Sequence, residues 1–95
     1  MYRVIPSRQF TRSLRKLKRS GMFKSSAEEN FNEAVNTLMA GKILPAPYTD
    51  HQLSGEWSAY RECHIKGNVL LVYERRDDLL ILVLIDIGSH SYLFG

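Results

Sequence analysis

The chain has 95 residues, of which 44% are hydrophobic and 24% charged. This composition is typical of one globular domain and excludes a disordered or fibrous protein. The single cysteine, Cys63, excludes an internal disulfide, and the basic N-terminal segment lacks the apolar core of a secretory signal. The longest apolar run, residues 79–85, is too short to cross a membrane. We therefore expect a cytoplasmic protein that does not act at membranes.

A short strand, Tyr2–Ile5, is the first predicted element, and Pro6 ends it. The next pattern predicts a helix capped by Ser7 and stopped at Gly21. A second helix is predicted from Ser26, which has capping-box spacing with Glu29, to Gly41. The apolar residues of the two helices recur at helical spacing: Phe10, Leu14 and Leu17 in the first, and Phe31, Ala34, Val35, Leu38 and Met39 in the second.

The first helix carries a block of basic residues with no acid among them: Arg8, Arg12, Arg15, Lys16, Lys18 and Arg19. Although the whole chain has a net charge of only +3, such a block favours a polyanionic partner such as nucleic acid, the ribosome or an acidic peptide. The alternative interpretation is an ordinary solvated helix face.

A loop rich in Pro and Gly, residues 42–57, separates the helices from three predicted strands. The strands are Ala59–Ile65, Val69–Arg75 and Leu79–Ile87, and the short turns between them require antiparallel pairing. The predicted fold class is α+β. It is a single domain, residues 1–95, with an N-terminal strand, two helices and an antiparallel meander of three or more strands, the helices packing on one face of the sheet.

The three histidines, His51, His64 and His90, have several possible roles. Each one alone is most simply a surface residue. Three imidazoles can also ligate zinc, but their spacing matches no compact zinc motif, so we predict no metal or cofactor. The third possibility is RNA cleavage by attack of the 2'-hydroxyl, because imidazoles supply the base and the acid, and Arg61 supplies positive charge. Strand alternation places Glu62 on the same face as His64 and Arg61 on the opposite face, which counts against that role for Arg61.

An aromatic side chain near the last histidine, Phe94 or Tyr92, is predicted to stack an unpaired base. Three motifs then resemble the YafQ branch of the RelE/ParE toxin superfamily: "DHQLSG", "RECHI" and "GSHSYLF", with "FTRSLRKLKRSG" resembling the basic first helix of that family. The resemblance implies a bacterial type II toxin that cleaves mRNA in the ribosomal A site and is inhibited by a cognate antitoxin.

Residue by residue, the resemblance implies that His51, His64 and His90 perform acid-base work and position the phosphate, and that Phe94 organises the mRNA. Asn68 occupies a position where the family has an acid, and it can only accept or donate a hydrogen bond. Asp50 or Glu62 then becomes a candidate for the missing charge.

Two other functions remain open from the sequence: a ParE-like inhibitor that binds DNA gyrase, and a degenerate toxin that only regulates its antitoxin. The retained histidines argue against the first, and only Asn68 hints at the second. In every case we expect an acidic antitoxin, a monomeric free toxin and a hetero-oligomeric complex.

Overall fold

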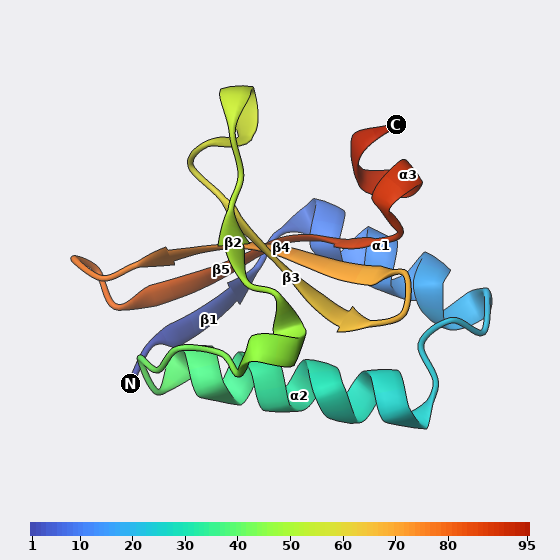
Figure 1. Ribbon diagram of the computed structural model, residues 1–95, viewed down its shortest axis with the longest axis horizontal. Helices are drawn as coiled ribbons and strands as arrows, with labels where there is room; N and C mark the ends of the chain where they lie inside the picture. Colours follow the sequence, from blue (N-terminus) through green and yellow to red (C-terminus); the bar gives the residue numbers. More distant parts are fainter.

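The computed structural model describes residues 1–95 and contains one five-stranded sheet with helices at its faces (Figure 1). The helices are α1 (Arg8–Arg19), α2 (Ser25–Met39) and α3 (His90–Phe94), and single 3-10 turns occur at η1 (Ala46–Tyr48) and η2 (Gly55–Trp57). The strands are β1 (Arg3–Pro6), β2 (His51–Gln52), β3 (Arg61–Lys66), β4 (Val69–Arg76) and β5 (Ile81–Gly88).

The strand order is β1-β5-β4-β3-β2, which confirms the predicted α+β fold and its antiparallel meander. The N-terminal strand β1 joins the sheet in parallel with β5. Two short elements, β2 and α3, were not predicted. The last strand begins at Ile81 instead of Leu79, because Leu80 takes a left-handed conformation, with φ of 52°, in the preceding turn.

The two long helices begin in different ways. Ser7 caps α1 as predicted, since its Oγ accepts a 2.9 Å hydrogen bond from the backbone N–H of Phe10. The predicted capping box of Ser26 in α2 is wrong: the N-cap is Lys24, and no side chain caps that end. Ser26 Oγ instead accepts a hydrogen bond of 2.6 Å from Lys66 Nζ, across to the end of β3.

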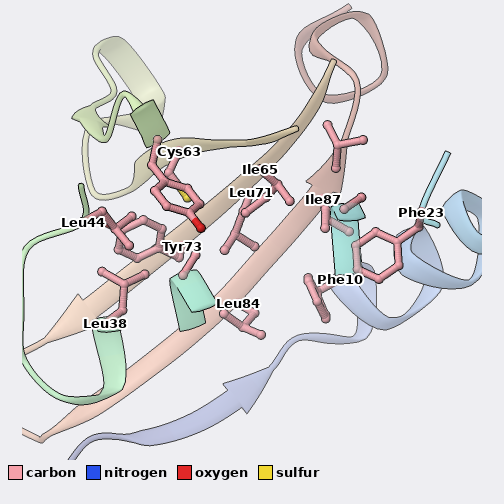
Figure 2. Close-up of a cluster of buried hydrophobic side chains, with 14 of the residues drawn as sticks. Phe10, Phe23, Leu38, Leu44, Cys63, Ile65, Leu71, Tyr73, Leu84 and Ile87 are labelled. Atoms are coloured by element: carbon pink, nitrogen blue, oxygen red, sulfur yellow. The ribbon is translucent and has the colours of Figure 1, made fainter. Parts of the chain in front are cut away.

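Both helices contribute to the same hydrophobic core, on one face of the sheet (Figure 2). Phe10 of α1 and Phe31 of α2 stack with ring centroids 5.9 Å apart, and Cys63, Leu71 and Tyr73 close the core from the strands. β4 is buried on both faces from Val69 to Tyr73, which explains its continuous apolar sequence.

The face of the sheet away from α2 is the side from which the β2–η2 segment and α3 project (Figure 1). No helix of the structure combines the length and the apolar character needed to cross a membrane. The β2–η2 segment and α3 carry His51 and His90, so two of the predicted site residues lie on this second face of the sheet.

Cys63 provides a test of the core. Its side chain has 0% exposure, and burial, followed by the charges of Asp50 and Glu62, raises the pKa of its thiol from 9.0 to about 12. We expect no labelling of the native protein by a thiol reagent at pH 8, and rapid labelling in denaturant. Because the unfolded thiol ionises first, stability should fall as the pH rises from about 9 towards 12. Fast labelling of the native protein would contradict this packing.

Candidate active site

An open pocket on the second face of the sheet collects residues from four separate elements. Its empty volume is about 470 Å³, and it is lined by His51, Leu53, Ser54, Trp57, Glu62, His90 and Phe94. These residues come from β2, from the η2 segment, from β3 and from α3. The structure thus brings two of the three predicted histidines to one pocket, together with the predicted aromatic residue.

Strand pairing explains how the first half of the pocket forms. His51 of β2 lies directly opposite Glu62 of β3, and alternation along β3 puts His64 on the same face as Glu62. Glu62 Oε1 lies 3.5 Å from His51 Nε2 and 3.9 Å from His64 Nε2. The two imidazole rings have centroids 6.5 Å apart. One carboxylate therefore lies beside both histidines.

His51 has a defined ring orientation. Its Nδ1 lies 2.8 Å from the carbonyl oxygen of Thr49, a residue in the left-handed conformation with φ of 48°. Because a carbonyl can only accept, Nδ1 carries a hydrogen, and in the neutral ring the lone pair is on Nε2. That nitrogen faces Glu62 and is the one available to take up a proton.

Glu62 was predicted only as a candidate, with Asp50, for the charge that Asn68 lacks, and the structure places it between the histidines. It is only 4% exposed, and its Oε2 atom has no hydrogen-bond partner. Burying a carboxylate with an unsatisfied oxygen is costly, and such groups occur mainly at functional sites. Its signal in the sequence was the alternation that placed it beside His64; its burial depends on the covering loop and could not be read from that pattern.

The second half of the pocket comes from α3. Ser89 Oγ caps this short helix by accepting from Tyr92 N. His90 stands at the first position with its ring centroid 5.3 Å from that of Phe94, and Phe94 meets Trp57 edge to face at 5.2 Å. Trp57 was not predicted to be a site residue, because nothing in the sequence of its loop indicated which face of the sheet it would cover.

Asn68 contacts the site through the backbone. Its Oδ1 accepts from the backbone N–H of His90 at 3.4 Å, from the turn between β3 and β4. The predicted hydrogen-bonding capacity of Asn68 is therefore directed at the start of α3. His64, by contrast, does not line the pocket that contains His51 and His90. It lines a different pocket with Tyr48 and Pro45.

Arg61 does not join the histidines. The register shift of β3 lies after His64, so simple alternation holds and Arg61 lies on the opposite face. Its guanidinium binds both carboxylate oxygens of Asp50 at 3.3 Å, and Tyr73 donates to the same carboxylate at 2.6 Å. Asp50 is thus committed to Arg61 and Tyr73, and the expectation that Arg61 stabilises a phosphate lacks support from its position.

The basic residues of α1 form a separate surface. All six predicted residues are exposed and none forms an ion pair: Arg8, Arg12, Arg15, Lys16, Lys18 and Arg19. Three of them, Arg8, Arg12 and Arg15, line a polar hollow with no hydrophobic residue in its wall. The surface is available to a polyanion and lies outside the histidine pocket.

The sheet with its parallel edge strand, the two helices on one face and the histidine pocket on the other define a toxin of the RelE-like fold. Residues 2–95 match the family "Bacterial toxin of type II toxin-antitoxin system, YafQ". The chain belongs to this family.

Known relatives agree with this assignment. The mRNA interferase toxin YafQ of Escherichia coli strain K12 is 39% identical over 61 residues, which are 62% of this chain and 64% of that protein. A copper-bound mutant toxin from Helicobacter pylori superposes with a TM-score of 0.87 at 38% identity, covering 99% of this chain and all of the other. The Escherichia coli DinJ-YafQ complex gives a TM-score of 0.84 at 26% identity, with both chains covered fully.

Replacing Glu62 tests how much the burial of its carboxylate lowers the free energy of unfolding. Glu62→Gln keeps the shape and removes the charge, so we expect the free energy of unfolding to rise by about 1 kcal/mol at pH 7. The lost contacts to His51 and His64 should subtract little, since both imidazoles are nearly half exposed to solvent. Urea unfolding measures the change, and Glu29→Gln on the exposed side of α2 is the matched control. A loss of stability in Glu62→Gln would contradict this account.

Proposed function

We propose that this protein is a ribosome-dependent mRNA endonuclease that acts in the cytoplasm as the toxin of a type II toxin–antitoxin pair. The observation that carries the proposal is the pocket that combines His51, His90 and Phe94 with the buried carboxylate of Glu62. Two imidazoles and an aromatic ring at one open pocket fit a single-stranded RNA substrate. The relative from Escherichia coli is itself an mRNA interferase.

The first half of the proposed reaction uses His51. Its Nε2 lone pair takes the proton from the ribose 2'-hydroxyl, and that oxygen attacks the adjacent phosphorus. The new O–P bond gives a phosphorane whose collapse leaves a 2',3'-cyclic phosphate. Glu62, 3.5 Å from Nε2, stabilises the imidazolium that forms during this step.

The second half requires an acid on the other side of the phosphate. His90 is our choice, because it projects from the start of α3 and lines the same pocket as His51. It gives a proton to the departing 5'-oxygen as the P–O bond breaks, which balances the proton taken by His51. His64, on the flank of Glu62, contributes positive charge when protonated.

The aromatic residues account for substrate positioning. Phe94 and Trp57 form an edge-to-face pair beside His90, and a splayed base can stack on such a platform. An open pocket with few polar groups holds RNA weakly by itself, so the ribosome must present the mRNA in a reactive geometry. The exposed basic face of α1 is the proposed contact with ribosomal RNA phosphates.

The basic face of α1 also indicates the chemical character of the antitoxin that would bind it. An acidic, amphipathic segment that folds on binding would neutralise it and prevent unproductive binding to RNA. The structural relative YafQ from Escherichia coli forms a complex with the protein DinJ. We propose a monomeric free toxin and a hetero-oligomeric toxin–antitoxin complex for this chain.

The reaction is tested with a defined mRNA on programmed 70S ribosomes. His90→Ala should lower the cleavage rate by about 10²- to 10⁴-fold, the usual contribution of one acid-base group. Ser91→Ala, on the exposed side of the same helix, should cleave like the wild type. Without ribosomes, the wild type should be nearly inactive.

A folded wild-type protein that cleaves no mRNA under either condition would refute the nuclease proposal. Inhibition of DNA gyrase would then be the next assay, because the alternative toxin class acts by binding without chemistry.

The role of α1 is tested by salt dependence. Arg12→Gln and Arg15→Gln should each weaken ribosome binding and make the slope of log K against log salt shallower by about 0.7 to 0.9, since each removes one phosphate contact. The control is Arg76→Gln at the β4–β5 turn, where the guanidinium pairs with Asp78. Equal slopes for the α1 variants and the wild type would exclude α1 from the ribosome contact.

A further inference from the structure

Tyr92 lies on the side of α3 away from the histidine pocket. It is two positions along the helix from both His90 and Phe94, so helical geometry directs its ring in nearly the opposite direction. Its hydroxyl is 2.9 Å from Ser13 Oγ and accepts from Gln9 Nε2 at 3.4 Å. Of the two aromatic candidates for base stacking, Tyr92 is therefore the one that faces away from the pocket, and it connects α3 to α1.

The contact extends along one stripe of α1. Ser13 is four positions after Gln9, and Lys16 is three positions after Ser13, which places all three on the same side of the helix. Lys16 Nζ lies 5.7 Å from the centroid of the Tyr92 ring. The ring is thus held by its hydroxyl and by a cation at its face, although the residue remains 44% exposed.

Two residues fit this contact closely. Ser13 is only 2% exposed on the core side of α1, where an apolar residue would be expected, and its hydroxyl is satisfied by Tyr92 and Gln9. Gly88 ends β5 directly under the ring, and a Cβ at this position would come within 2.5 Å of Tyr92 Cδ2. A side chain as small as alanine at position 88 would displace the ring.

Apart from the contact of Phe94 with Trp57, the rest of α3 is weakly anchored. A helix of five residues is not stable by itself, and the bond from His90 N–H to Asn68 is long at 3.4 Å. We propose that Tyr92 is a positioning residue that clamps α3 to α1 and so sets the places of His90 and Phe94. The consequence for catalysis rests on the proposed nuclease function, whereas the clamp itself does not.

The sharpest test is a double-mutant cycle with Gly88→Ala and Tyr92→Ala. Each single change should raise the backbone mobility of residues 90–94 in NMR relaxation and lower kcat by about 10- to 100-fold, because small displacements of a catalytic group are costly. With the ring gone, the added methyl meets no clash, so the double variant should match Tyr92→Ala. KM for programmed ribosomes should stay within about twofold, since the basic face is unchanged.

A milder pair of variants separates the hydroxyl from the ring. Tyr92→Phe retains the ring and should recover most of the order of α3, with kcat about fivefold below wild type. Tyr2→Phe is the matched control: it removes a hydroxyl that donates to Asp77 at 2.6 Å beside the opposite end of β5. That variant should leave both α3 mobility and kcat unchanged.

Several results would overturn the clamp. If α3 is as ordered in Tyr92→Ala as it is in the wild type, the clamp is refuted, whether or not the protein cleaves RNA. A double variant whose kcat falls by the product of the two single losses would also contradict it. So would a rise in KM with kcat unchanged. If the wild type proves to have no nuclease activity, only the proposed function fails, and the NMR comparison still decides the clamp.

Discussion

Burial of the antiparallel meander on the α1–α2 side is the constraint on which the pocket depends. Cys63 and Ile65 insert into the core, so β3 cannot shift by one residue without turning them outward and Glu62 and His64 inward. β2 takes its own register from β3 through the pairing of His51 with Glu62. Hydrophobic packing on one face of the sheet therefore fixes the distances between polar groups on the other.

The long elements were predictable from local patterns. Both helices show apolar residues at helical spacing and end at glycines with positive φ, Gly21 and Gly41, where residues with side chains are disfavoured. Alternation along β3 also predicted that Glu62 and His64 share a face, since this depends on one strand alone. The convergence of the histidines came from the resemblance of three motifs, because no local pattern relates residues so far apart.

The remaining features depend on tertiary contacts. β2 and α3 have two and five residues, too few to show a period. The position of Tyr92 was not predictable, because the room left by Gly88 and the hydroxyl of Ser13 decide where that ring lies. The burial of Glu62 depends equally on which segments cover the second face of the sheet. Contacts distant in sequence, such as that of Ser13 with Tyr92, decide these features.

The parallel pairing of β1 with β5 has a consequence for how the protein is made. β1 is synthesised before its partner β5, which follows only after both long helices and the rest of the meander. Such non-local pairing raises the contact order and slows folding. A nascent chain that ends before β5 has neither its complete sheet nor α3, so it lacks half of the histidine pocket. A partly translated chain therefore cannot perform the chemistry that we propose for this pocket.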